Sequence, residues 1–528
     1  MENNLEESNR IIKNTQTVSI LTFLSRILGA GRDLVIANIF GAGGVTDAFV
    51  QAFTIPNILR RLTAEGAMTL AFIPIYTEIR EGKNREEAKK FAAKILGLVI
   101  ALTFILSGIG IIVSPQLVYI LSAGFASNPE KFELTVFLTR IMFPYLILVS
   151  LVSWSSAVLN AERRFAVSAA SPIFLNIGII ISAIIISPLL NEPIIGIGIG
   201  VLLGGISQII FQIPALIKIG YFFYPRNFFN DLNVKKLLNL LGPSLLGLAV
   251  YQINIIVLRN LASFMPTGQV TYYYNASRLS EFTLGIFAFA ITTASFPELS
   301  NHMAKANWEK IRNTLNFTVS TTLLIIFPAS FGLAIAAEPI VSMLYFHGAY
   351  SWEDIEITAL TLQAFALSIP AVAIIRLQTV LFFTLKDTKT PVKVSLISII
   401  VTGLLGWWLS QSLEIVGLAL GLTLGTWIQL FLLTIFLLNN SELRKKWWPW
   451  RSSLIYLASS GVMTLFVSYI IDFGLWEDGP FIFYNWLIFF GFITGAVIFY
   501  AVLLFILRDE HFVKILIQMK SKLKNNEL

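Results

Sequence analysis

Apolar stretches long enough to cross a membrane follow one another along almost the whole chain, and they restrict its fold more than any other feature. A transmembrane helix needs about 20 predominantly apolar residues. Of the 528 residues, 56% are hydrophobic and 13% are charged, whereas soluble domains carry about 25% charged residues. The sequence therefore predicts an all-α polytopic membrane protein with fourteen transmembrane helices, over residues 16–39, 46–76, 92–114, 132–158, 166–188, 194–217, 237–261, 270–297, 314–337, 357–384, 392–410, 415–438, 452–471 and 482–507.

The loops between these spans alternate in charge. If the N-terminus is cytoplasmic, only Lys131 and Arg259 of the 38 basic residues fall in outer loops, while the inner segments include the basic runs 80–94 and 508–524. An excess of Lys and Arg on the cytoplasmic side orients membrane proteins. We therefore expect both termini in the cytoplasm. The same pattern explains the net charge of +7 without a nucleic-acid partner.

An internal repeat is visible in the sixth and twelfth predicted spans. In each, three glycines at every fourth position are followed by a glutamine, at a constant spacing between the two copies. Glycine at every fourth position gives a helix one small face for close packing. The residues are Gly196, Gly200, Gly204 and Gln208 in the first copy, and Gly417, Gly421, Gly425 and Gln429 in the second.

Two unrelated packing motifs would give the same glycine pattern, but a second similarity supports a repeat. Arg61 and Pro74 in the second span have counterparts in Arg278 and Pro297 in the eighth. Six spans per copy is an even number, so the copies have the same orientation, as in many transporters. We therefore expect two parallel six-helix lobes, over residues 1–233 and 234–440, with two additional helices and a basic tail over 441–528.

Charged residues interrupt several of the apolar spans, above all the first, the second and the eighth. An ionised side chain in hydrocarbon costs about 3 kcal/mol or more, so such residues usually face a polar cavity or pair with one another. Guanidinium groups hold phosphate oxygens through paired hydrogen bonds and keep their charge when partly buried. The candidate anion-binding residues are Arg26, Arg32, Arg60 and Arg278, with Asp33, Asp47, Glu65 and Glu281 as supporting acids.

The alternative is that these charges form internal salt bridges within a helix bundle. With Arg61 of the second span included, five basic residues stand against four acidic ones, which favours a cavity that holds an anion. Arg60 and Arg61 face about 100° apart on a helix, so one of the two is expected to point inward. Two further arginines within spans, Arg140 and Arg376, are single and are interpreted as structural.

Sequence motifs for catalysis and metal binding are missing. The chain has no cysteine, and His302, His347 and His511 are far apart in sequence, so neither thiolate chemistry nor a metal site is expected. No phosphate-binding loop of the G-x-x-x-x-G-K-[ST] type, no H-E-x-x-H and no G-x-S-x-G is present. We therefore expect no catalytic residues and no cofactor.

Four segments closely resemble the MurJ (MviN) family of lipid II flippases, which shares a superfamily with the MATE multidrug exporters. They are SRILGAGRD at 25–33, FGAGGVTDAF at 40–49, PNILRRLTAEGAMTLAFIP at 56–74, and YYYNASRLSEFTLGIFAFAITTASFPELS at 272–300. The resemblance implies two lobes in a V shape around a cationic cavity, with two C-terminal helices forming a groove for a lipid tail. It also implies that Arg26, Arg32, Arg60 and Arg278 contact substrate, with acidic Asp47, Glu65 and Glu281 nearby.

The substrate that this resemblance implies is lipid II, undecaprenyl-pyrophosphate carrying a disaccharide-pentapeptide. A monomer in the bacterial cytoplasmic membrane would move it from the inner to the outer leaflet by alternating access. Some relatives bind sodium through an aspartate in the seventh span, but the matching stretch holds Gln252, Asn254 and Leu258. Because leucine stands where an acid would be expected, a sodium site is not predicted. Either protons or the membrane potential could then drive transport.

Three other functions fit the composition. A flippase for another polyprenyl-linked oligosaccharide would use the same arginines. A cation-coupled drug exporter should instead offer acidic or aromatic cavity residues to cationic substrates, which the excess of arginine argues against. A membrane scaffold would leave the intramembrane arginines without a role.

Overall fold

The structure is a computed structural model that describes residues 2–61, 68–222, 224–439, 442–444 and 447–517. The chain forms two compact units, Met1–Thr271 and Tyr272–Leu528. Helix α11 begins at Gln269, at the end of unit 1, and continues into unit 2. The lobe boundaries at residues 233 and 440 that the repeat suggests stay a prediction.

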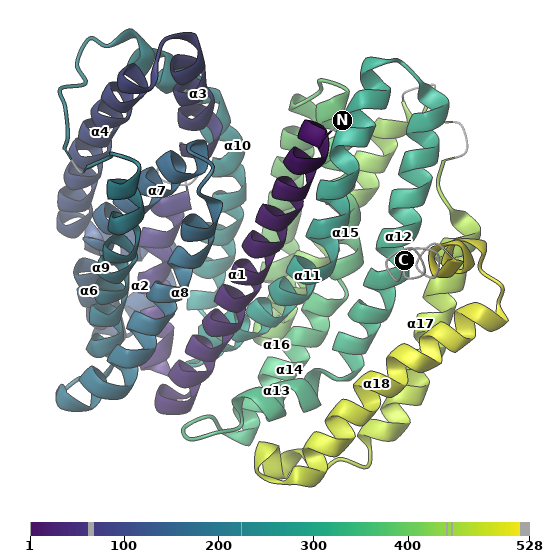
Figure 1. Cartoon of the computed structure of the whole chain (residues 1–528). Helices are drawn as coiled ribbons and strands as arrows, with labels where there is room; N and C mark the ends of the chain where they lie inside the picture. The colour runs from purple at the N-terminus through teal and green to yellow at the C-terminus, as the bar shows by residue number, and fades with distance from the viewer. Residues whose placement is uncertain (1, 62–67, 223, 440–441, 445–446, 518–528) are drawn as a thin grey trace. The chain divides into compact units, whose positions relative to one another are not determined.

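Unit 1 consists of helices throughout the part that the structure describes (Figure 1). Its long helices are α1 (Glu2–Phe40), α2 (Gly44–Arg60), α3 (Ile73–Gly82), α4 (Arg85–Ile112), α5 (Ser114–Leu121), α6 (Pro129–Met142), α7 (Tyr145–Ala161), α8 (Phe165–Ile181), α9 (Ile194–Lys218) and α10 (Leu232–Ser263). Short π- or 3-10-helical turns are η2 (Met68–Phe72), η3 (Ala123–Ser127), η4 (Ser182–Ile186) and η5 (Ser187–Leu189).

The helices of unit 1 pack in pairs around an apolar core. Helix α1 lies on α8, α8 on α9, α2 on α6, and α4 on α7. Trp154 of α7 is buried among Tyr76, Ile95 and Leu216, and its indole Nε1 donates to the Ala92 carbonyl at 2.9 Å. The indole therefore adds apolar area to the core without leaving its N–H unsatisfied.

Unit 2 is also helical over its described residues. Its elements are α11 (Gln269–Ala304), α12 (Trp308–Ile335), α13 (Ala337–Tyr345), α14 (Trp352–Ala366), α15 (Ile369–Thr384), α16 (Lys389–Leu438), α17 (Trp450–Ile471), η6 (Trp476–Phe481) and α18 (Phe483–Ile506).

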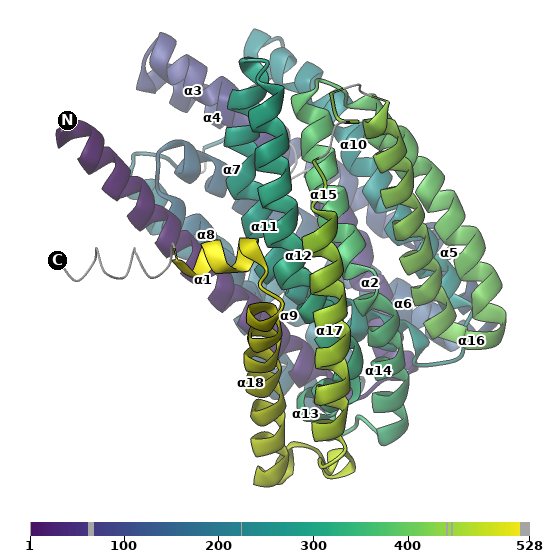
Figure 2. The same cartoon turned by 90° about the vertical axis from the view of Figure 1, so that its right-hand side faces the viewer.

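Helices α17 and α18 lie side by side as an antiparallel pair in both views (Figure 1, Figure 2). Helix α17 packs on α12, and Tyr456 and Met463 enter the shared apolar core. From α18, the Tyr500 hydroxyl donates to the carbonyl of Leu324 in α12 at 3.1 Å. The two last long helices are therefore an integral part of unit 2.

Each of the fourteen predicted spans falls on helix in the described part of the chain. Nine helical segments there are long and apolar enough to cross a membrane. One of them, α16, contains two predicted spans, because Glu414 breaks the helical backbone with φ 46° and ψ −128°. The chain is thus a multi-pass membrane protein, while the count of fourteen crossings stays a prediction.

Both glycine series bring helices into close contact. In unit 1, a Cβ on Gly204 of α9 would lie 2.8 Å from the Leu175 carbonyl oxygen of α8. In unit 2, a Cβ on Gly421 would lie 2.4 Å from the Cα of Gly406, in the other half of α16. Neither position has room for a side chain, so the small faces predicted from the sequence are confirmed as packing surfaces.

The glutamines that end the two series also act alike. Gln208 donates through Nε2 to the carbonyl of Ser171 on α8 at 3.2 Å. Gln429 donates through Nε2 to the hydroxyl of Ser395 at 3.0 Å. In each unit, a close-packed helix pair is therefore joined by a glutamine on one helix and a serine on the other.

Candidate functional site

Arg32 of α1 is buried and its charge is balanced within unit 1. Its Nη2 lies 2.6 Å from Oδ1 of Asp33, and its Nε donates to the same oxygen at 3.0 Å. Nη1 donates to Oδ1 of Asn176 on α8 at 3.3 Å. The Asn176 amide in turn donates to the carbonyl of Ser25 at 3.1 Å. Asp33 is thus paired with Arg32, and Asn176 joins the two helices at this point.

Arg26, at the middle of α1, is in a different situation. Its side chain is partly buried. No ion pair or hydrogen bond joins it to any other residue that the structure describes. Placing a cation in an apolar helix without a neutralising partner is costly. Arg26 is therefore the residue of α1 that is best prepared to receive an anion.

Arg60 lies in the last turn of α2, where a cation interacts favourably with the helix dipole. Its Nε donates to Oδ1 of Asn57 at 3.2 Å. Arg60 and Arg61 are both partly buried, so burial does not distinguish the two. Glu65, the predicted supporting acid of this helix, lies outside the described residues.

Arg278 lies on α11 in unit 2 with its predicted acid beside it. Nη1 is 3.3 Å from Oε2 of Glu281, one turn along the helix. Nε donates to the Tyr274 hydroxyl at 3.2 Å, and the guanidinium lies 5.1 Å from the centre of the Tyr274 ring. The side chains of Arg278 and Glu281 are 38% and 52% exposed. Exposed ion pairs contribute at most about 1 kcal/mol, so Arg278 can exchange this carboxylate for another anion.

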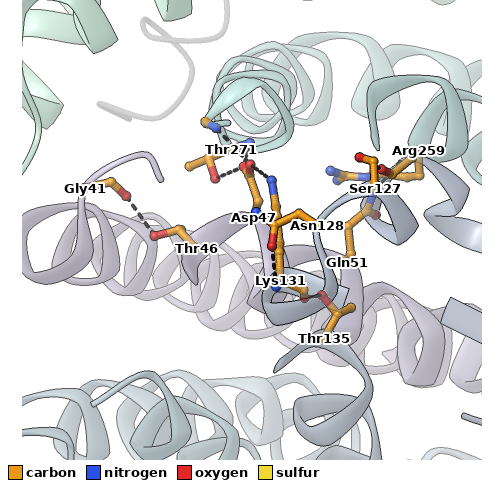
Figure 3. Close-up of polar contacts among 12 residues, drawn as sticks. Gly41, Thr46, Asp47, Gln51, Ser127, Asn128, Lys131, Thr135, Arg259 and Thr271 are labelled. Carbon is orange, nitrogen blue, oxygen red and sulfur yellow. Dashed lines mark hydrogen bonds and ion pairs between the residues drawn. The ribbon is translucent and has the colours of Figure 1, made fainter. Parts of the chain in front are cut away.

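Asp47 near the start of α2 is fully buried, and the partners of its carboxylate are a lysine and the beginning of α11 (Figure 3). Oδ2 is 2.7 Å from Nζ of Lys131 and accepts from the Gly268 amide at 2.8 Å. Oδ1 accepts from the amide and the hydroxyl of Thr271 at 2.9 and 2.7 Å. The sequence predicts that Asp47 supports the arginines, but in the structure it neutralises Lys131.

The position of this carboxylate follows from helix electrostatics. The first amide groups of an α-helix have no intrahelical acceptor and carry a partial positive charge. Burying a carboxylate costs several kcal/mol unless its lone pairs are satisfied. Here three donors and one ammonium group satisfy them. Asp47 therefore fixes the first turn of α11 against α2 and α6.

Lys131 is itself held in place by its own helix. Its amide donates to Oδ1 of Asn128 at 3.1 Å, at the N-terminus of α6, and its carbonyl accepts from the Thr135 hydroxyl at 2.7 Å (Figure 3). Its ammonium lies 4.1 Å from the centre of the Phe125 ring. The side chain is 9% exposed. The ion pair with Asp47 is therefore preorganised and largely removed from solvent.

Arg259, the other basic residue assigned to an outer loop, is also buried and lies near α2. Gln51, one turn after Asp47, donates through Nε2 to the Arg259 carbonyl at 2.9 Å (Figure 3). From the sequence, Lys131 and Arg259 are distinguished only by their predicted place in outer loops. Basic residues are rare on that predicted side, and an acid, Asp47, begins the second predicted span. Together these two features are the signal that could have indicated an ion pair. Asn176 and Thr271 carried no signal that distinguishes them from other polar residues.

Among the described residues, no group of three or more His, Asp or Glu side chains comes together as a set of metal ligands. Of the predicted site residues, the structure pairs Arg32 with Asp33 and Asn176, Arg278 with Glu281, and Asp47 with Lys131. Arg32 belongs to α1, Arg278 to α11 and Asp47 to α2. What they offer chemically is charge, through guanidinium groups that can bind an oxyanion, and no nucleophile or acid–base pair.

The sequence profile of the family described as "Lipid II flippase MurJ" matches residues 36–476. Curated relatives give the same description. The chain is 35% identical over 437 residues to the "Probable lipid II flippase MurJ" of Vibrio cholerae, covering 81% of this chain and 82% of the relative. It is 31% identical over 458 residues to the "Lipid II flippase MurJ" of Burkholderia cenocepacia, covering 86% of each.

Solved structures agree. One described as "Lipid II flippase MurJ, inward closed conformation" matches with a TM-score of 0.78 and 28% identity, over 93% of this chain and 99% of that one. An inward-facing multidrug resistance transporter of the MATE family matches with a TM-score of 0.66 over 80% of this chain and 96% of that one. At 14% identity, the second match concerns the fold alone.

Proposed function

Because this chain belongs to the MurJ family of lipid II flippases, we propose that it moves lipid II from the inner to the outer leaflet of the bacterial cytoplasmic membrane. The observation that carries the proposal is the family match over residues 36–476. Members of this family are transporters and not enzymes. The substrate is undecaprenyl-pyrophosphate carrying a disaccharide-pentapeptide, which the cell uses to build peptidoglycan.

The pyrophosphate is held by Arg26, Arg32, Arg60 and Arg278 in this proposal. A guanidinium group can bind two phosphate oxygens at once and keeps its charge in an apolar environment. Two of the four are ready for an anion. Arg26 has no ion-pair partner among the described residues, and the exposed pair of Arg278 with Glu281 is weak.

Arg32 has a different part, because Asp33 already neutralises it. A phosphate oxygen reaches its guanidinium only by displacing the Asp33 carboxylate or by sharing the remaining N–H groups. Arg32 therefore contributes mainly after Arg26 has bound the pyrophosphate. We expect Arg32 variants to impair transport mainly because they remove the link between α1 and α8. Loss of the first contact with the pyrophosphate should matter less.

Transport follows alternating access. The headgroup site opens toward the inner leaflet, binds lipid II, and then opens toward the outer leaflet while the prenyl chain stays in lipid. A ligand shifts such an equilibrium only by its differential affinity for the two states. The pyrophosphate supplies that difference, because its negative charge neutralises the arginines and removes the repulsion that opposes their approach.

A vesicle assay tests the proposal. Purified protein is reconstituted with lipid II, and the fraction of lipid II that an external, membrane-impermeant reagent reaches is followed over time. We expect Arg26→Ala and Arg278→Ala to abolish the protein-dependent change, and Arg26→Lys to restore it only in part, because lysine cannot bind two oxygens in one plane. Arg140→Ala is the control, since Arg140 is an exposed arginine of α6 outside the predicted set.

Full lipid II transport by Arg26→Ala and Arg278→Ala would overturn the arginine assignment. Transport of another polyprenyl-linked oligosaccharide without lipid II transport would overturn the substrate assignment. Changed sensitivity to cationic drugs on deletion, with cell-wall synthesis intact, would favour an exporter instead. In the same vesicles, an imposed membrane potential, a proton gradient and a sodium gradient identify the driving force.

A further inference from the structure

The last helical segment of the described chain runs across the direction of the helix before it. After α18 ends at Ile506, the chain turns at residues 507–509 and forms a short helix over residues 510–517. Figure 2 shows this helix, in yellow, running across the direction of α18. It lies beyond residue 476, where the family match ends, so family membership assigns it no role.

The turn between the two helices is fixed by a buried carboxylate. Asp509 accepts hydrogen bonds from the Tyr456 hydroxyl at 2.9 Å and the Ser452 hydroxyl at 3.0 Å, both on α17. The same side chain accepts from the amide of Phe512 at 2.8 Å, and so caps the N-terminus of the short helix. Arg508 adopts a φ of 51°, which reverses the chain. The direction of the short helix is therefore set by specific contacts.

One side of the short helix packs against unit 2. His511 Nε2 lies 3.0 Å from the Thr321 hydroxyl of α12, and its ring meets the Phe317 ring edge-on at 4.9 Å. Phe512 and Ile515 pack against the apolar core. These contacts hold the start of the helix close to α12 and one of its sides against the apolar core.

The rest of the helix surface divides into an apolar and a polar side. Glu510 and Lys514, four residues apart, are exposed on a common face. Leu516 is 43% exposed and, at 100° per residue, lies about 160° from Lys514 around the helix axis. Ile517 is 63% exposed and lies only about 60° from Lys514, at the border of the polar side. This is the pattern of a helix that lies between protein, hydrocarbon and water.

We propose that helix 510–517 lies in the membrane surface on the side of the C-terminus, where it binds anionic phospholipid. Leu516 enters the part of the acyl chains next to the headgroups, and Lys514 contacts the phosphate groups. The sequence that follows is also basic, with Lys520, Lys522 and Lys524. Basic segments next to a transmembrane helix are attracted to anionic leaflets in this way.

Lipid is favoured as the occupant because the apolar side continues the lipid-exposed surface of α18. Phe505 and Ile506, at the end of that helix, are 68% and 66% exposed. A soluble protein partner would have to cover the exposed residues of a membrane-spanning helix as well. The basic sequence after residue 517 also complements a phosphate surface better than it complements another basic chain such as a second copy.

The absence of cysteine from the sequence makes a direct test simple. A spin label is attached to Leu516→Cys or, as the matched control on the polar side, to Lys514→Cys, in full-length protein in bilayers containing phosphatidylglycerol. Accessibility to oxygen, which concentrates in lipid, is compared with accessibility to a water-soluble nickel chelate. Ile506→Cys at the end of α18 serves as the reference for a lipid-exposed site.

We expect the ratio of oxygen to nickel accessibility to be severalfold higher at residue 516 than at residue 514, and close to that at residue 506. Equal, high nickel accessibility at 514 and 516 would overturn the proposal, as would protection of both sites from both reagents. Replacing Lys520, Lys522 and Lys524 with glutamine should lower the ratio at 516 in phosphatidylglycerol but not in phosphatidylcholine alone. The same ratio in both lipids for the unmodified tail would refute the preference for anionic lipid. The test does not depend on transport.

Discussion

Replacing Lys131 with methionine tests whether the buried ion pair with Asp47 stabilises unit 1. Methionine keeps most of the aliphatic length beside Phe125 and removes the charge. The Asp47 carboxylate, which is 0% exposed, would then keep its three hydrogen-bond donors but lose its counter-ion at 2.7 Å. Removing one partner of a buried pair costs about 3–5 kcal/mol. For a unit of this size, that corresponds to a fall in Tm of about 6–10 °C.

The double variant distinguishes an ion pair from general packing. In Asp47→Asn with Lys131→Met, no charge is left unpaired, and the asparagine oxygen can still accept from the start of α11. We expect the double variant to lose less stability than the sum of the single variants, with a coupling energy of about 1–3 kcal/mol. The exposed pair of Lys236 with Glu78, at 2.6 Å, gives the control: Lys236→Met should cost less than about 1 kcal/mol.

The assay is thermal unfolding of the full-length protein in detergent, followed by intrinsic tryptophan fluorescence. Each variant is compared with the unmodified protein at one pH and one salt concentration. If Lys131→Met lowers Tm no more than Lys236→Met, or if the two single effects simply add, the reasoning about the buried pair is refuted.

Three further predictions concern packing and pH. Gly204→Ala should destabilise the protein by about 1–3 kcal/mol because the new Cβ meets the α8 backbone, whereas Gly108→Ala, with nothing within 4 Å, should be neutral or stabilising. Burial raises the pKa of Asp231, but hydrogen bonds from Lys94 and from two amides of α10 lower it more. The stability that the Asp231 carboxylate contributes should therefore be lost as pH falls below about 4. In thermal unfolding, Asp231→Asn should remove this pH dependence. Burial lowers the pKa of His511; Lys514 also lowers it, whereas Asp509 raises it. Protonation of His511 as pH falls below about 6.5 should therefore loosen helix 510–517. Increased mobility of a spin label on this helix would report the change.

Each of these has an outcome that would contradict it. Equal Tm values for the two glycine variants would mean that α8 and α9 are not closely packed. An unchanged acid dependence in Asp231→Asn would assign that dependence to other carboxylates. A pH-independent mobility of helix 510–517, or one that persists in His511→Gln, would show that the histidine contact does not hold the helix.

The transmembrane helices and the glycine faces were predictable because both depend on local sequence. Runs of apolar residues determine a spanning helix whatever its neighbours are. Glycines at every fourth position allow two helices to pack closely. Gly204 and Gly421 lie at such close contacts. The break at Glu414 lies in the short interval between the eleventh and twelfth predicted spans.

The ion-pair partners were less predictable, because they depend on which helices become neighbours. Asp33 follows Arg32 directly in sequence, and the two side chains are paired in the structure. Asp47 and Lys131 are 84 residues apart, and only the packing of α2 on α6 brings them together. A pair of the second kind cannot be read from the sequence alone, and the supporting role of the acids at a substrate site stays a prediction.

The proposed transport of lipid II depends most on the binding of its pyrophosphate by arginines in the apolar helices. The direct measurement is the Kd of purified protein in lipid nanodiscs for lipid II, compared between the unmodified chain and Arg26→Ala. Hydrogen bonds to a charged group contribute about 1.5–3 kcal/mol, so we expect the Kd to rise by about 10- to 100-fold. An unchanged Kd in Arg26→Ala, in protein that remains folded, would contradict the account.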